Sequence, residues 1–342
     1  LHGFDYSDQD AVSAQNEEMM RDVVRLKDHP ALLMWGLGNE LNLRAKNDGV
    51  WDAIEDLALR IKEADPDHPV TTMLAGIDSP TVNAIAKRAP SLDFLSFQIY
   101  GEIDQLPAIL EKVGYDGPYQ VTEWGPTGHW ESPETHWKRP FEPSSTQKAN
   151  DIARRYQEII LADSKCCLGA YIFLWGQKQE RTPTWYGMFL EAGERTAAVD
   201  VMQKAWTGEW PAQRAPEIQS LRLNDQEAPA SVEGITNQVF RAEVDAADKD
   251  DHFISWRVRE EVPAALQSDG GDFEPTPPTI EAVIGTQNRQ FNFQLSEPGE
   301  YRLFCQIDTP YDSSAVANIP FLIKPEPQKR TRFFNLFRRS AA

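Results

Sequence analysis

MWGLGNE, residues 34–40, is the stretch that decides how this sequence folds. It completes an apolar run that begins near residue 31 and ends in the polar pair Asn39-Glu40. A run that is apolar on both faces is typical of a strand buried in a parallel sheet. A carboxylate placed directly after such a strand costs desolvation free energy, so Glu40 is a candidate functional residue.

Strands and helices are predicted to alternate along the chain on both sides of this stretch. Apolar runs predict strands at residues 31–38, 69–75, 93–100, 119–124 and 167–175. Helical spacing of apolar residues predicts helices at 7–26, 51–61, 82–89, 106–113, 146–162 and 197–206. This alternation favours a βα-barrel or a doubly wound sheet. The predicted strands are not followed by a glycine-rich dinucleotide loop, which weakens the nucleotide-binding version.

In a βα-barrel the chemistry lies at the carboxyl ends of the strands, and notable residues fall there. Glu40 follows one predicted strand, and Glu123 ends another in YQVTEWG. Two Glu from different strands that converge over one pocket suit glycoside hydrolysis, in which one protonates the leaving oxygen and the other attacks the anomeric carbon. The retaining form of this mechanism requires carboxyl groups about 5–5.5 Å apart.

The motifs WGLGNE and VTEWG resemble the clan of retaining glycoside hydrolases with (β/α)8 barrels, most closely the family 2-type enzymes. In that clan the acid/base Glu follows an Asn at the end of strand 4, and the nucleophile Glu ends strand 7; Asn39-Glu40 and Glu123 match these positions. Tyr100 is similar to the Tyr after strand 6, and Trp175 is placed like the Trp that ends strand 8. The resemblance covers roughly residues 1–210.

This resemblance implies a role for each matched residue. Glu123 is expected to attack and form a glycosyl-enzyme, and Glu40 to protonate the departing oxygen and then deprotonate the incoming water. Asn39 is expected to hydrogen-bond the 2-hydroxyl of the sugar. Tyr100 is expected to orient Glu123, and Trp175 to supply an apolar platform. The function predicted is hydrolysis of O-glycosidic bonds by a retaining β-glycosidase.

The sequence departs from the family pattern because only strands 4 to 8 of the barrel are recognised. Five parallel strands cannot close an eight-stranded barrel. The fold class expected is therefore α/β, an N-terminally truncated (β/α)8 TIM barrel followed by a small immunoglobulin- or fibronectin-like sandwich. We expect the chain to be a fragment of a longer gene product, whose activity on its own is open.

Two long loops follow the last two predicted strands, and both are rich in aromatic residues. Long loops in compact domains are often functional. Trp130 in the first loop and Trp185 in the second are predicted to bind substrate. Glu180 is the rival carboxylate near the site, which either binds sugar hydroxyls or pairs with Arg181.

No metal or cofactor is expected. The spacing of His129 and His136 matches no zinc pattern. Cys166, Cys167 and Cys305 show no metal spacing either, and we interpret them as buried thiols.

Three regions are expected along the chain. Residues 1–212 form the partial catalytic barrel, 216–324 form a β-sandwich accessory domain, and 325–342 form a basic disordered tail. Short alternating runs separated by turn residues predict the sandwich. We expect it to act as a spacer, because no row of exposed Trp is evident, with glycan binding as the alternative.

Composition excludes some classes of partner. Acidic residues outnumber basic ones 53 to 34, and the net charge of -19 disfavours nucleic acid as a partner. The sequence contains no run of about 18 apolar residues, so no transmembrane segment is predicted. The expected partner is an oligo- or polysaccharide. The oligomeric state stays open, and so does the location, which could be secreted, periplasmic or at the cell surface.

Three other functions compete with hydrolysis. A transglycosylase would use the same two Glu and differ only in what intercepts the intermediate. A non-catalytic carbohydrate-binding protein would keep the pocket, although the presence of both Glu argues against it. A metal-dependent barrel hydrolase would need a cluster of ligands at the strand ends, which the five predicted strands do not supply.

Overall fold

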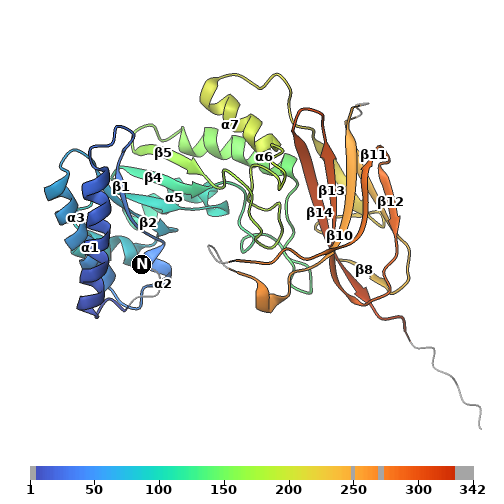
Figure 1. Cartoon of the computed structure of the whole chain (residues 1–342), viewed down its shortest axis with the longest axis horizontal. Helices are drawn as coiled ribbons and strands as arrows, with labels where there is room; N and C mark the ends of the chain where they lie inside the picture. The colour runs from blue at the N-terminus through green and yellow to red at the C-terminus, as the bar shows by residue number, and fades with distance from the viewer. Residues whose placement is uncertain (1–4, 248–250, 269–272, 328–342) are drawn as a thin grey trace, which may run out of the picture.

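The computed structural model describes residues 5–247, 251–268 and 273–327 (Figure 1). The first of its two regions contains a parallel sheet. Its strands pair in chain order, all of them parallel, as β1 (Trp35–Asn39), β2 (Val70–Ala75), β3 (Phe94–Gln98), β4 (Tyr119–Trp124) and β5 (Cys167–Ile172). Within the described residues, β1 pairs with β2 alone and β5 with β4 alone, so this sheet is open. The predicted alternation of strands and helices is confirmed.

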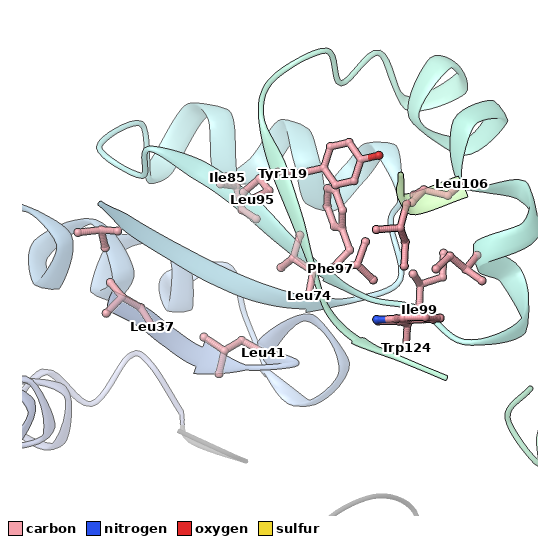
Figure 2. Packing of buried hydrophobic residues seen from close by; sticks show 14 of the residues in the cluster. Leu37, Leu41, Leu74, Ile85, Leu95, Phe97, Ile99, Leu106, Tyr119 and Trp124 are labelled. Carbon is pink, nitrogen blue, oxygen red and sulfur yellow. The ribbon is translucent and has the colours of Figure 1, made fainter. Parts of the chain in front are cut away.

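Helices connect the strands and pack on the sheet through apolar side chains. They are α1 (Gln9–Leu26), α2 (Leu41–Arg44), α3 (Gly49–Ala64), α4 (Ser79–Arg88), η1 (Gly101–Gln105), α5 (Leu106–Val113), α6 (Ser145–Arg155) and α7 (Ala197–Thr207). Figure 2 shows Ile85 of α4 and Leu106 of α5 beside the sheet residues Leu95 and Phe97. Burial of such side chains drives this packing. Among the described residues, none of the helices has the length and apolar character needed to cross a membrane.

Helix ends follow local signals in the sequence. The Asp8 carboxylate accepts the Ala11 N–H at the start of α1, and Ser144 with Gln147 forms a capping box at the start of α6. Gly114 ends α5 in the left-handed conformation, with φ of 74°.

Strands β1, β3 and β5 are shorter in the structure than expected, and β3 is Phe94–Gln98 rather than residues 93–100. Strand β1 begins at Trp35 rather than at residue 31, because the preceding residues form a turn in which the Leu32 N–H donates to the His29 carbonyl. Strand β5 ends at Ile172 rather than at residue 175, because the Leu174 N–H donates to the carbonyl of Tyr186 in the following loop. The predicted helix at 146–162 is α6 followed by the π-helical turn η2 (Tyr156–Ile160).

Antiparallel pairing dominates the second region. One sheet has the order β11-β10-β13-β14-β8 and the other has the order β12-β9-β6-β7. Among the strands of the described residues, β8 and β14 are the one pair in these sheets that is parallel. The elements are β6 (Ile218–Leu223), β7 (Gln226–Glu227), β8 (Val232–Ile235), β9 (Phe240–Ala246), β10 (Phe253–Glu260), η3 (Ala264–Leu266), β11 (Thr279–Thr286), β12 (Gln290–Phe293), β13 (Gly299–Asp308) and β14 (Ser314–Lys324). The inner faces share one core, in which Trp256 stacks on Phe291 with ring centroids 5.9 Å apart. Of the predicted basic tail, 328–342 lie outside the described residues.

Buried polar side chains join the two regions. Glu142, in the loop before α6, is 5% exposed and accepts from Lys148 at 2.5 Å. Its second oxygen accepts from Asn318 of β14 at 2.6 Å. Arg302 of β13 donates to the Pro140 carbonyl at 3.0 Å. The loop after β4 is therefore anchored on the outer face of β13 and β14, which Figure 1 shows beside α6.

Candidate active site

A cavity of about 910 Å³ lies at the carboxyl ends of the parallel strands. Each of the five strands contributes lining residues at or just after its end: Asn39 and Glu40, Ala75 and Gly76, Gln98 and Tyr100, Glu123, and Phe173 and Leu174. The carboxyl end of a parallel sheet is where α/β folds bind their ligands. The structure thus brings Asn39, Glu40, Tyr100 and Glu123 to one cavity.

Hydrogen bonds tie four of these side chains into one group, which we call the cavity floor: Asn39, Gln98, Tyr100 and Glu123. Gln98 Nε2 donates to Asn39 Oδ1 at 2.6 Å and to Glu123 Oε1 at 2.8 Å. The Tyr100 hydroxyl donates to Glu123 Oε2 at 2.8 Å. Both oxygens of the Glu123 carboxylate are therefore held, which fixes its orientation.

Sequence reasoning missed Gln98. It pairs directly with Glu123 in the register of β3 and β4, and it is 5% exposed. The available signal was a long polar side chain at the end of a strand, FLSFQ, whose residues are all buried. Buried amides are found where they have hydrogen-bond partners, so such a residue points to other polar groups nearby.

Burial controls the protonation of the floor. It raises the pKa of the Glu123 carboxyl, and the hydrogen bond from Tyr100 and the charge of Lys178 offset this only in part. Burial also raises the pKa of Tyr100, so its hydroxyl keeps its proton and donates. A carboxylate in this setting is more basic than one in water.

Glu40 lines the same cavity from the end of β1. Its backbone lies in the left-handed region, with φ of 50° and ψ of 38°, and its N–H donates to the Met73 carbonyl at 3.0 Å. Non-glycine residues adopt this conformation infrequently, and active sites are among the places where they do. The conformation turns the chain from β1 into α2 at the cavity edge.

Charged loop residues form a second group, the cavity wall: His129, Lys178 and Glu180. Lys178 Nζ lies 2.6 Å from Glu180 Oε2, and His129 Nε2 lies 3.2 Å from Glu180 Oε1. Burial acts to raise the pKa of Glu180, but the interactions with His129 and Lys178 outweigh it and lower that pKa. Glu180 therefore stays ionised more readily than Glu123.

The three predicted Trp residues lie in different surroundings. Trp130 lines the cavity and its ring meets that of Tyr100 edge-on at 5.4 Å. Trp185 is completely buried, and its indole N–H donates to the Thr127 carbonyl at 3.0 Å. Trp175 is 61% exposed and packs on Phe189, outside the set of residues that line the cavity.

Two expectations need correction for this reason. Trp185 packs behind the cavity and presents no face to a substrate. Trp175 lies beyond the end of β5, and Phe173 occupies the lining position in its place.

Within the described residues there is no cluster of His, Cys, Asp or Glu that could hold a metal ion. His129 contacts Glu180, whereas His136 lies 2.7 Å from Glu233.

Comparison with known families adds to this geometry. Residues 4–127 match the family described as glycosyl hydrolases family 2, TIM barrel domain. This part of the chain resembles the family 2 glycosyl hydrolases. The matched segment contains the whole cavity floor and Glu40, whereas the cavity wall lies beyond it. No curated protein sequence matches the chain significantly.

Several solved structures of glycosidases are similar to the chain at low identity. An FMN-binding beta-glucuronidase from Facaelibacterium prausnitzii L2-6 is 17% identical with a TM-score of 0.47, over 94% of this chain and 45% of that one. Bacteroides uniformis beta-glucuronidase 2 is 15% identical with a TM-score of 0.43, over 91% and 37%. An alpha-L-arabinofuranosidase from Thermotoga maritima is 12% identical with a TM-score of 0.40, over 86% and 68%. The chain spans less than half the length of either beta-glucuronidase.

Outside the family 2 match, the second region holds the cavity wall in place. Glu274, 2% exposed, lies between η3 and β11. Its Oε1 accepts from the Arg181 N–H at 2.6 Å and from Gln179 Nε2 at 3.2 Å, and its Oε2 lies 3.2 Å from Arg181 Nη1. Arg181 has a φ of 61°, so this carboxylate stabilises an uncommon turn beside Glu180. The antiparallel region therefore contacts the loop that carries Glu180, whereas its expected role as a spacer stays a prediction.

Proposed function

We propose that this chain acts in the retaining hydrolysis of β-glycosidic bonds in an oligo- or polysaccharide. Support comes from one observation above all, the doubly hydrogen-bonded Glu123 in the cavity that Glu40 also lines. A nucleophilic carboxylate needs a fixed orientation, and Gln98 with Tyr100 supplies it. The resemblance to family 2 glycosyl hydrolases over this segment supports the same chemistry.

Two carboxyl groups would perform the reaction in two steps. In the first, the ionised Glu123 forms a bond to the anomeric carbon while Glu40 gives its proton to the leaving oxygen. In the second, Glu40 takes a proton from water, the water oxygen bonds to the anomeric carbon, and Glu123 leaves as a carboxylate. No oxidant, reductant or metal enters this balance.

Other lining residues would recognise the sugar. Asn39, held by Gln98, would hydrogen-bond the hydroxyl beside the reacting carbon. Trp130 would offer its exposed ring as an apolar platform. Trp175 and Trp185 are not included among the proposed sugar contacts, because neither lines the cavity.

The domain organisation is proposed on the same basis. Residues 1–212 would be the later part of a (β/α)8 barrel, in which β1 to β5 correspond to strands 4 to 8. Residues 216–324 would form an immunoglobulin- or fibronectin-like module. The open sheet of five parallel strands supports the first assignment, and two packed sheets of short strands support the second.

The test is hydrolysis of a panel of aryl β-glycosides by the full chain and by Glu123→Ala and Glu40→Ala. We expect either substitution to lower kcat by about 10³-fold or more. Azide should restore turnover of Glu123→Ala and give a glycosyl azide of inverted configuration. The control is Glu111→Ala, an exposed residue of α5, which should match the parent. An inactive parent, or an unchanged Glu123→Ala, contradicts the proposal.

Product analysis separates the related alternatives. Transfer of the glycosyl group to added sugar in preference to water would assign a transglycosylase that uses the same two Glu. Tight binding of oligosaccharide by a parent that turns over none of the glycosides would assign a non-catalytic binding protein.

A further inference from the structure

A second cavity of about 280 Å³ lies between the loop after β5 and the outer face of β10, β13 and β14. It shares no lining residue with the cavity of the candidate active site. Its size is close to the lower end of ligand pockets, which run from about 300 to 1,000 Å³. We call it the arginine cleft, after the lining residues Arg257 and Arg259.

The two arginines occupy the same face of β10, since side chains two residues apart in a strand point the same way. Val258, which lies between them, and Trp256, which precedes them, point into the core. Arg257 Nη1 donates to Gln306 Oε1 at 3.1 Å, and Arg259 Nε donates to Thr279 Oγ1 at 3.2 Å. Over the described part of the chain, neither forms a salt bridge with a carboxylate.

Two half-buried positive charges on one face repel each other. Burial and then the charge of Arg257 lower the pKa of the Arg259 guanidinium, and Glu191 offsets this only in part. Glu191 and Glu194 also line the cleft, so an anion that enters it would have to bind on the side of the two guanidinium groups.

Polar atoms around the cleft also lack partners. Arg259 Nη1 and Glu194 Oε2 are buried without a hydrogen-bond partner among the residues that the structure describes. Buried polar atoms are rarely left in this state, and an absent ligand is one of the recognised explanations. The Phe304 ring, 5.8 Å from the Arg259 guanidinium, adds an apolar surface to the same cleft.

We propose that the arginine cleft binds a sugar acid, with its carboxylate held by Arg257 and Arg259. The planar guanidinium matches a carboxylate in bidentate geometry. Glu194 and Gln306 would accept hydrogen bonds from the sugar hydroxyls, and Phe304 would pack on the sugar ring. The volume suits one sugar unit, either free or at the end of an acidic oligosaccharide. Binding here does not depend on the proposed hydrolysis.

The experiment is calorimetric titration of the full chain with sodium glucuronate, a glucuronate-terminated disaccharide, glucose and sodium sulfate at constant ionic strength. We expect saturable binding of glucuronate, and at least tenfold weaker binding of glucose and of sulfate. The glucuronate-terminated disaccharide should bind with the same affinity as glucuronate if the cleft accepts the end of a chain. Arg257→Gln and Arg259→Gln should each weaken glucuronate binding at least tenfold. Arg241→Gln, at an exposed arginine of β9, is the matched control and should bind as the parent does.

Glu123→Gln separates this cleft from the candidate active site, because it should leave the glucuronate affinity unchanged. Thermal unfolding establishes that each variant is folded, and Arg259→Lys, which keeps the charge without the bidentate geometry, replaces any Arg259→Gln protein that is not. Absence of saturable glucuronate binding, equal affinity for glucose or sulfate, or parent-like binding by both arginine variants overturns the proposal.

Discussion

The cavity floor and the cavity wall are supported in different ways. Gln98 and Glu123 of the floor are paired neighbours in the register of one parallel sheet. Lys178 and Glu180 of the wall lie on a loop, and the carboxylate that shapes this loop, Glu274, is 93 residues from Arg181 along the chain. The comparison teaches that the proposed chemistry depends on the sheet, whereas the shape of the surrounding site depends on the second region.

The largest effect is expected from the contact that joins the regions. Glu142→Ala would leave Lys148, 6% exposed, without its acidic partner. Breaking a buried ion pair in this way destabilises proteins by about 3–5 kcal/mol. Urea unfolding should show this loss. Glu134→Ala, which removes an exposed pair with Lys138, should cost about 1 kcal/mol or less. Equal effects of the two substitutions would mean that the buried Glu142–Lys148 pair contributes no more to stability than the exposed pair.

Next comes the floor. Tyr100→Phe removes a hydrogen bond to a charged group, worth about 1.5–3 kcal/mol, so kcat/KM should fall by about 10- to 150-fold. That bond lowers the pKa of Glu123, so its loss raises the pKa further. Because Glu123 must be ionised to attack, the acidic limb of the pH profile should move to higher pH. Tyr171→Phe, at an exposed residue of β5, should leave the profile in place. A limb that stays where it was in Tyr100→Phe would dissociate Tyr100 from Glu123.

The wall should respond in a different kinetic parameter. Glu274→Gln weakens the hold on Arg181 without touching the floor, so we expect KM to rise by about 3- to 10-fold while kcat changes less than about twofold. Glu281→Gln, at an exposed residue of β11, is the control. A fall in kcat with a shifted pH profile would show that the wall acts on the chemistry, and the distinction between wall and floor would be lost.

Trp130 and Trp175 are both exposed, and the smallest effect of all is expected for Trp175. Trp130→Ala removes a ring that lines the cavity, and KM should rise by about 3- to 10-fold. Trp175→Ala should change KM by less than about twofold, since that ring lies outside the lining set. Inhibition by a non-hydrolysable glycoside would measure both. If Trp175→Ala raised KM more than Trp130→Ala did, Trp175 would have to be counted among the residues that contact substrate.

The difference between a floor on the sheet and a wall on loops also explains which site residues could be predicted from the sequence. Asn39, Glu40, Tyr100 and Glu123 could be placed because strand ends are visible as the ends of apolar runs, and parallel strands end at one edge. The limits of β5 could not be predicted, because the Leu174 N–H pairs with Tyr186 in a later loop, and Trp175 was misplaced for this reason.

Composition alone misled at other positions. Trp185 has the residue type of a sugar platform, but its burial depends on packing behind the cavity, which no local pattern reveals. Glu274 was invisible because it lies in the irregular stretch between η3 and β11, and its partner Arg181 is 93 residues away in the sequence. Gln98 was the one missed residue with a local signal, a polar side chain at the end of a buried strand.

The hydrogen bonds of Glu274 to the loop beside Glu180 have a consequence for how the lining of such a pocket changes in evolution. Recombination or gradual divergence of the antiparallel region would reshape the wall while every residue of the floor stayed the same. Substrate preference could then drift through changes remote from the reacting atoms, with the bond-breaking machinery inherited intact. In lineages of this kind, differences in specificity would be found in the antiparallel region, and shared descent would be visible at the strand ends of the parallel sheet.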